Sequence, residues 1–356
     1  MQCLADFQAA RCTLQAEGAQ LPTFSGLASG TAIPQGDSAE DEREEARPEY
    51  QHGWQRYTST SREDHAFRIL LQNSSRQDKA RLRSCGGENN ARWLTTLPTC
   101  EPLRLRSQVM QVLFRRRLGL PIAAVPGQCE APSCRASLDA HGFHRTCCTR
   151  TGRTHGRHSA GLGPWQQVLG EAGYRTRSER MMRDTNIAVD PSDGRRMDIV
   201  AAPGARGPGA FNGLTLFCDL TIASPLTRTG AARSGSASFN GRALNAAIAK
   251  KRNTYSDVTS SGVARLLVLG CEVYGRWSDD ARDLIRQLAR SKSREAPPAL
   301  RRAALQAWTK RWWGIVGVGV QRAIGEALLL EGGADLIPCS SLFEEPTLTD
   351  LVSDHA

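Results

Sequence analysis

The chain has 356 residues, a formal net charge of +10 and a pI of about 9.3. This length allows two modest domains with their own cores. The positive charge favours a polyanionic partner, and nucleic acid before a membrane surface. The longest strongly apolar run begins at Trp312 and is too short to cross a bilayer, which excludes a membrane-spanning protein.

The N-terminal residues contain no basic start followed by an apolar block, so we predict a nuclear or cytoplasmic protein that is not secreted. The chain has eleven cysteines, an odd number. Without a secretion signal, this number favours reduced thiols and metal ligands over a disulfide framework.

Composition divides the chain into six predicted segments. The first mixes Gly, Ser, Pro and Gln with an acidic run around Glu40, which is typical of a solvated linker. The predicted segments are a disordered linker at 1–61, a helical segment at 62–125 whose last helix is ended by Pro121, a Cys/His segment at 126–159, a core at 160–277, C-terminal helices at 278–331 and a flexible acidic tail at 332–356.

The core is predicted to run in the order helix, three strands, helix, strand. The first helix is predicted to open at Gly163-Pro164, because proline is favoured in the first turn, and to close at Gly173. The following elements are strands at 174–183, 196–202 and 214–223, a helix at 240–255 and a strand at 264–273, before helices at 278–292, opened by Ser278, and 299–330. This order predicts an α/β fold with one mixed sheet flanked by helices.

Two aspartates interrupt apolar, strand-like runs. Asp198 lies in RRMDIVAA, and Asp219 lies in LTLFCDLTIASP. A carboxylate in such a strand is costly to desolvate unless it has a partner, a metal or a catalytic task. If the two strands are neighbours, the pair can bind a hard cation such as Mg²⁺ for phosphodiester hydrolysis. The alternative is a pair of structural ion pairs with Arg195 or Arg196.

Lys251 is predicted to face the same place from a helix. Positions 244, 248, 251 and 255 share one helical face, and Leu244 and Ile248 mark that face as buried. Lys251 and Tyr255 therefore turn inward, where the two aspartates can supply the counter-charge that a buried lysine needs. The alternative is that Lys251 reaches the surface and Tyr255 only packs.

The Cys/His segment contains ligands at spacings that suit zinc. Cys129 and Cys134 are separated by four residues, and His144 and Cys148 by three. A structural zinc knuckle is the favoured interpretation, and reduced thiols in a loop are the alternative. His158, in the basic stretch that follows, could contact phosphate, belong to the metal or active site, or do neither.

Several of these pieces together resemble the region that follows the polymerase in non-LTR retrotransposon open reading frames. Residues 160–273 are similar to the restriction-like endonuclease of those elements, a member of the PD-(D/E)XK nuclease superfamily whose core order is helix, three strands, helix, strand. The matching pieces are ARWLTTLPT, RRRLGLPI, the Cys-Cys-His-Cys cluster, RRMDIV, FCDLT, KRNTYSDV, LLVLGCEVYGRWS and WTKRWW.

The resemblance implies a role for each matching residue. Asp198 and Asp219 would be the two acids that hold Mg²⁺ or Mn²⁺, and Lys251 would replace the superfamily lysine, whose usual position holds Thr221. Tyr255 would match the tyrosine that follows the lysine, and Glu171 on the first helix would be a third acid. The Cys-Cys-His-Cys cluster would be the structural zinc knuckle that precedes the nuclease.

The favoured function is therefore a metal-dependent endonuclease module of a retrotransposon-derived protein that cleaves target DNA. Its expected partners are DNA, with RNA as an alternative, and a reverse transcriptase encoded upstream. Thr221 at the lysine position, and Met197 where the family often has proline, leave a second hypothesis open: a catalytically inactive relic that still binds nucleic acid. A third is an interaction fragment that binds no nucleic acid.

Overall fold

The computed structural model describes residues 2–16, 54–123, 127–129, 131, 133–204 and 210–329. The chain divides into two compact units, Met1–Ser75 and Arg76–Ala356. The first unit contains helices α1 (Gln2–Ala16) and α4 (Trp54–Asn73), so helices occupy parts of the segment 1–61 for which the sequence predicts a linker. The predicted acidic tail at 332–356 lies outside the described residues.

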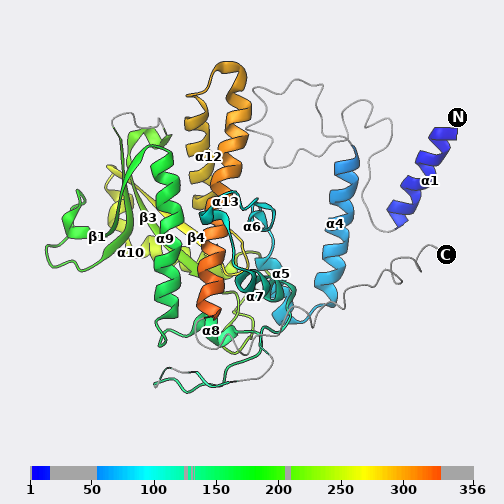
Figure 1. Ribbon diagram of the computed structural model, residues 1–356, viewed down its shortest axis with the longest axis horizontal. Helices are drawn as coiled ribbons and strands as arrows, with labels where there is room; N and C mark the ends of the chain where they lie inside the picture. Colours follow the sequence, from blue (N-terminus) through cyan, green and yellow to red (C-terminus); the bar gives the residue numbers. More distant parts are fainter. Residues whose placement is uncertain are drawn as a thin grey trace. The chain divides into compact units, whose positions relative to one another are not determined.

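The second unit holds one four-stranded mixed sheet and most of the helices (Figure 1). Its strands are β1 (Tyr174–Met181), β2 (Arg196–Pro203), β3 (Thr215–Ala223) and β4 (Ala264–Glu272). Its α-helices are α5 (Arg76–Ser84), α6 (Arg92–Thr95), α7 (Ser107–Leu118), α8 (Phe143–Cys147), α9 (Arg153–Glu171), α10 (Arg242–Thr254), α11 (Ser256–Ser260), α12 (Asp279–Ser293) and α13 (Arg301–Leu329).

The strands lie in the order β1-β2-β3-β4, with β1, β2 and β3 antiparallel and β3 parallel to β4. Helix α9 precedes β1, and α10 connects β3 to β4, as a parallel crossover requires. The predicted α/β class, mixed sheet and C-terminal helices are therefore confirmed. Every predicted strand begins or ends within two residues of its observed bounds.

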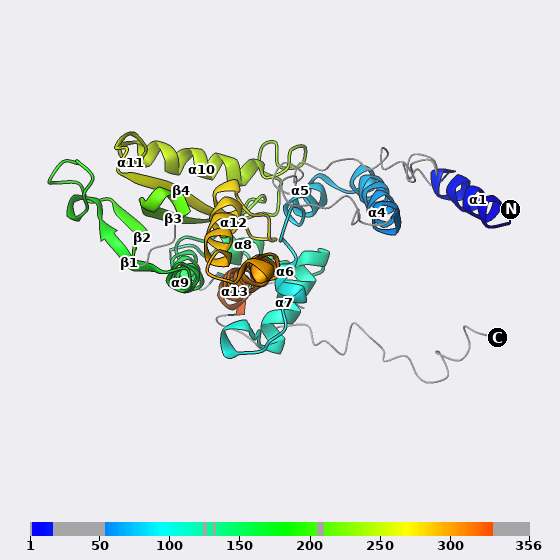
Figure 2. The ribbon, with the colours of Figure 1, turned by 90° about the horizontal axis from the view of Figure 1, so that it is seen from above.

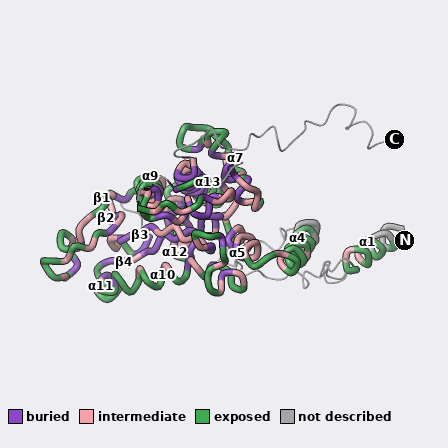
Figure 3. Tube along the Cα trace, turned by 90° about the horizontal axis from the view of Figure 1, so that it is seen from below, coloured by how far each residue is buried: buried purple, intermediate pink, exposed green. Residues whose placement is uncertain are grey.

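Helices cover both faces of the sheet (Figure 2). On one face, Leu216, Cys218 and Leu220 of β3 pack with residues of α9, α12 and α13 in the largest hydrophobic cluster. On the other face, Phe217 packs with Tyr255 and other residues that follow α10. Figure 3 shows the buried residues gathered along β3, β4, α12 and α13. Since the middle of β3, from Leu216 to Leu220, is buried on both faces, a polar side chain in that stretch is desolvated.

Two predicted helix boundaries are wrong, each for a local reason. Pro164 lies inside α9, which begins at Arg153, so this proline does not open the helix. Helix α7 ends at Leu118 because Gly119 adopts the left-handed conformation (φ 80°), two residues before Pro121. The predicted helical segment 62–125 holds the end of α4 and helices α5, α6 and α7.

Ser278 begins α12 as predicted, and its hydroxyl accepts a hydrogen bond from Ala281 N. The same hydroxyl accepts from Gly270 N and donates to Val268 O, which ties the start of α12 to β4. None of the helices in the described part of the chain has the length and apolar character needed to cross a bilayer.

Candidate functional site

The structure brings the two strand aspartates together at one point of the sheet. Asp219 lies in β3 with no exposed surface, beside Val268 of β4. Regular pairing of β2 with β3 ends at Ile199 and Cys218, one residue short of both aspartates. Beyond that pair, Asp198 Oδ2 accepts a hydrogen bond from Leu220 N at 2.7 Å. The Asp198 carboxylate therefore takes the place of a backbone acceptor where the two strands separate.

Lys251 points at this pair, as its helical phase predicts. Its ammonium donates to Asp219 Oδ2 at 2.9 Å and lies 2.9 Å from Oδ1. Burial raises the pKa of Asp219 and the charge of Asp198 raises it further, while Lys251 opposes both. Asp219 Oδ1 is buried and lies 2.9 Å from the Lys251 ammonium, so a metal ion bound there would have to compete with Lys251. The alternative in which Lys251 reaches away to the surface is wrong.

His158 of α9 completes the group of charged side chains. Its Nε2 lies 2.9 Å from Asp198 Oδ2 and 3.1 Å from the carbonyl oxygen of Leu220. The hydrogen bond to Asp198 raises the pKa of His158, although burial works in the opposite direction. Of the roles that the sequence left open for His158, the structure places it with the aspartates. We call Asp198, Asp219, Lys251 and His158 the acidic cluster.

Tyr255 adjoins the acidic cluster. Its hydroxyl donates to the carbonyl oxygen of Arg196 at 2.5 Å. Burial raises the pKa of Tyr255, the nearby charges of Asp219 and Asp198 raise it further, and an interaction of its hydroxyl with the Asp219 carboxylate also raises it. This buried phenol therefore stays protonated and fixes the end of α10 against the start of β2.

The arginines proposed as alternative partners of the aspartates are engaged elsewhere. Arg195 forms ion pairs with Asp193 at 2.6 Å and Asp257 at 2.8 Å. Arg196 lies 3.9 Å from Glu179. The interpretation of Asp198 and Asp219 as partners of these two arginines is therefore wrong.

Glu171, implied as a third acid by the family resemblance, is held at the far end of α9. Its carboxylate accepts hydrogen bonds from Arg311 at 2.7 Å and from the Trp312 indole at 2.9 Å. Burial alone would raise the pKa of Glu171, but the hydrogen bonds from Arg311, Gln167 and Trp312 lower it. Glu171 therefore anchors α13 to α9 and contacts no member of the acidic cluster.

The four zinc-ligand candidates meet at a single point in the segment before α9. One ligand atom of each lies within 4.8 Å of the others, for Cys129, Cys134, His144 and Cys148. Sγ of Cys148 lies 3.9 Å from Sγ of both Cys129 and Cys134, and Cys134 Sγ lies 3.5 Å from His144 Nε2. A tetrahedral zinc would place sulfurs about 3.8 Å apart and sulfur about 3.6 Å from nitrogen. The Cys/His cluster therefore can bind a metal such as zinc.

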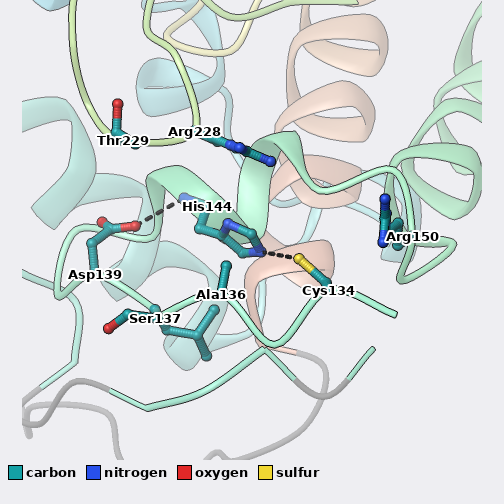
Figure 4. Close-up of a pocket in the computed structure, with 9 residues that line it drawn as sticks. Cys134, Ala136, Ser137, Asp139, His144, Arg150, Arg228 and Thr229 are labelled. Atoms are coloured by element: carbon teal, nitrogen blue, oxygen red, sulfur yellow. Dashed lines mark hydrogen bonds between the residues drawn. The ribbon is translucent and has the colours of Figure 1, made fainter. Parts of the chain in front are cut away.

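The turn around Asp139 holds His144 in place. The Asp139 carboxylate accepts backbone hydrogen bonds from His141, Phe143 and His144 at 2.8–3.0 Å, which caps the short helix α8. Figure 4 shows Asp139, His144 and Cys134 beside an open pocket that Arg228 also lines. Burial lowers the pKa of His144, so its imidazole is neutral, the form that ligates metal.

We compared the chain with models of protein families and with curated proteins. No family model matches it, and no curated protein matches it either. The two clusters are therefore interpreted from their own geometry.

Proposed function

We propose that the chain is a metal-dependent DNA endonuclease module with a restriction-endonuclease-like core, derived from a non-LTR retrotransposon. One observation carries this proposal: Lys251, on the crossover helix, reaches Asp219 on a buried strand, directly beside Asp198. Two carboxylates that can hold a metal ion, with an amine beside them, are a set of groups suited to metal-dependent phosphodiester hydrolysis. The observed order of elements, helix, three strands, helix and strand, supports the same proposal.

Asp198 and Asp219 would hold Mg²⁺ or Mn²⁺ through their carboxylate oxygens, the ligands that these hard cations prefer. When bound, such an ion activates water and neutralises charge on the phosphate. Lys251 would donate a hydrogen bond to a non-bridging oxygen of the scissile phosphate. Leu220 N and His158 hold Asp198 in one orientation. The water oxygen would form the bond to phosphorus as the opposite P–O bond breaks, with the water proton passing to bulk solvent and the leaving oxygen taking a proton from bulk solvent.

The Cys/His cluster would hold a structural zinc ion through three thiolates and one imidazole, which leaves no open position for catalysis. Its role would be to hold α8 and the start of α9, from which His158 projects. A basic chain with a charge of +10 suits DNA, with RNA as the alternative polyanion, and an upstream reverse transcriptase as the protein partner.

One observation favours a second candidate, an inactive nucleic-acid-binding relic. Both carboxylates already have cationic partners within the chain: Asp219 has Lys251, and Asp198 has His158. A divalent ion would have to displace these partners. Thr221 also stands where the superfamily has its lysine, so catalysis depends on Lys251 alone.

Nicking of supercoiled plasmid in Mg²⁺ or Mn²⁺ distinguishes the two candidates. We expect the full chain to nick the plasmid. Asp219→Asn should lower the nicking rate by at least about 1000-fold, since the variant lacks a carboxylate that would ligate the metal. Asp283→Asn is the matched control, because this aspartate pairs with Arg286 on α12, away from the acidic cluster. Equal nicking rates in Asp219→Asn and the control would contradict the endonuclease hypothesis. Cleavage of a labelled RNA transcript tests RNA as the alternative substrate.

A further inference from the structure

A second hollow lies beside the acidic cluster, with a volume of about 610 Å³. It is formed by the end of β3, the loop that follows β3, the start of α10, α8 and the first half of α9. Its charged lining residues are all arginines, Arg157, Arg233 and Arg242, and no acidic residue lines it. Hydroxyl groups line it as well, from Thr146, Thr154, Thr221, Ser224 and Ser234. We call this hollow the arginine groove.

Arg157 is the informative member of the arginine groove. It is 9% exposed, and the burial lowers its pKa. Its Nη1 donates to the carbonyl oxygen of Thr146 at 3.0 Å, whereas Nε has no hydrogen-bond partner. No carboxylate forms an ion pair with it in the described part of the chain. A buried guanidinium without a counter-charge is costly, so the groove is suited to an anion from outside.

The arginine groove is continuous with the acidic cluster along two elements. Thr221, which lines it, lies on the same face of β3 as Asp219 and two residues further on, about 7 Å away. On α10, Ala247 lines the groove and Lys251 lies one turn later on the same helical face. That separation suits neighbouring phosphates of one nucleic-acid strand.

We propose that the arginine groove binds the phosphodiester next to the scissile one in the same strand. This inference rests on the proposed function for the identity of the anion. Arg157 provides the buried positive charge, and the exposed Arg233 and Arg242 contact the phosphate from the rim. The Thr146 carbonyl that anchors Arg157 belongs to α8, which carries His144, so the Cys/His cluster also fixes one wall of the groove.

The test is the binding of a short fluorescein-labelled DNA duplex, followed by fluorescence anisotropy without added Mg²⁺. The double variant Arg233→Gln/Arg242→Gln keeps the buried core intact, so its fold should be unchanged. We expect it to bind about 10- to 100-fold more weakly, with a salt dependence reduced by about two phosphate contacts. Arg157→Met should weaken binding at least as much, and Arg286→Gln, which removes the same charge from α12, should not.

Equal affinities of the double variant and Arg286→Gln would overturn the inference. Inorganic phosphate is the second probe: displacement of the duplex by millimolar phosphate would identify a site for a free small anion and would also overturn it. In plasmid nicking, the double variant should raise KM and leave kcat unchanged, since it loses binding shared by substrate and transition state.

The two proposals can fail separately. If the groove variants lose duplex binding and the unaltered chain does not nick DNA, the groove binds phosphate but the chain is not an endonuclease. If the groove variants bind normally and Asp219→Asn loses nicking, the chain is an endonuclease but the groove does not bind the substrate.

Discussion

The Cys/His cluster and the acidic cluster are assembled in different ways. All ligands of the Cys/His cluster come from residues 129–148, within 20 residues of chain that form tight turns and one short helix. The acidic cluster draws on α9, β2, β3 and α10, from His158 to Lys251, and so depends on the packing of the whole sheet. The first is a local arrangement that a cation can organise, and the second is a product of the tertiary fold.

The clusters also differ in how their charge is balanced. The acidic cluster contains its own cations, Lys251 and His158, within 2.9 Å of its carboxylates. Neighbouring sulfurs of the Cys/His cluster lie 3.9 Å apart, and one of them lies 3.5 Å from His144 Nε2. A metal bound there would replace the protons of these thiols, whereas in the acidic cluster a metal must compete with Lys251.

The largest effect is expected from breaking the Cys/His cluster. Cys148→Ser should lose the bound metal and destabilise the chain by at least about 4 kcal/mol, because a structural zinc contributes most of the folding free energy of such a segment. Cys147→Ser is the control, since the Cys147 thiol instead donates to the Leu226 carbonyl. Elemental analysis should give one zinc per chain for the control and none for Cys148→Ser. One zinc in both would contradict the assigned ligand set.

Helix α9, which carries His158 of the acidic cluster, can be displaced by a substitution where it crosses α13. A Cβ at Gly319 of α13 would lie 2.2 Å from Pro164 Cγ of α9. Gly319→Ala should therefore push the helices apart and destabilise the chain by about 3 kcal/mol. Gly170→Ala, in α9 with no atom near its Cβ position, should instead stabilise it by about 0.5–1 kcal/mol. Chemical denaturation measures both, and equal effects would contradict the close packing of α9 on α13.

Removal of Lys251 tests the internal charge balance of the acidic cluster. Lys251→Met leaves the buried Asp219 carboxylate without its partner, which should cost about 2 kcal/mol, less than for a fully buried pair because Lys251 is 34% exposed. Asp219→Asn should raise the free energy of unfolding by about 1 kcal/mol, because it removes a desolvated charge, as expected if the proposed function is the reason for that charge. Unfolding in urea checks both changes, and a loss of stability in Asp219→Asn would indicate a purely structural ion pair.

The smallest effect is expected at Glu171, which anchors α13 without belonging to either cluster. Its lowered pKa means that its stabilising contribution is present above the unfolded pKa of about 4.3 and is lost as the pH falls through the lower folded value. Glu171→Gln should cost about 1 kcal/mol at pH 7 and almost nothing once the pH is below the lowered folded pKa of Glu171. Thermal unfolding against pH measures this, with Glu326→Gln, an exposed partner of Arg106, as the control. A cost that does not depend on pH would exclude the ion pair as its cause.

The strands and the inward face of α10 could be predicted because their signals are local. Alternating or continuous apolar runs locate the strands, and the spacing from Leu244 to Tyr255 fixes the direction of Lys251. The Cys/His spacing likewise predicts the ligands that converge. In each case, the residues that decide the geometry lie within a few turns of one another in the chain.

The parts that could not be predicted depend on contacts between distant segments. Pro164 is tolerated inside α9 where it packs against Gly319, a contact that no local pattern shows. Glu171 turns to Arg311 and not to the aspartates because α13 lies alongside the end of α9. The burial of Arg157 could not be predicted from the sequence, since the basic stretch that contains it resembles an exposed loop.

The central claim is that the two clusters bind two different cations, and a titration of the zinc-loaded chain with Mn²⁺, followed by electron paramagnetic resonance, tests it most directly. We predict one Mn²⁺ site that is lost in both Asp198→Asn and Asp219→Asn, with the zinc content unchanged. Lys251→Met should bind Mn²⁺ more tightly, because the competing ammonium is gone. No binding by the unaltered chain, or binding that survives in Asp219→Asn, would contradict the account.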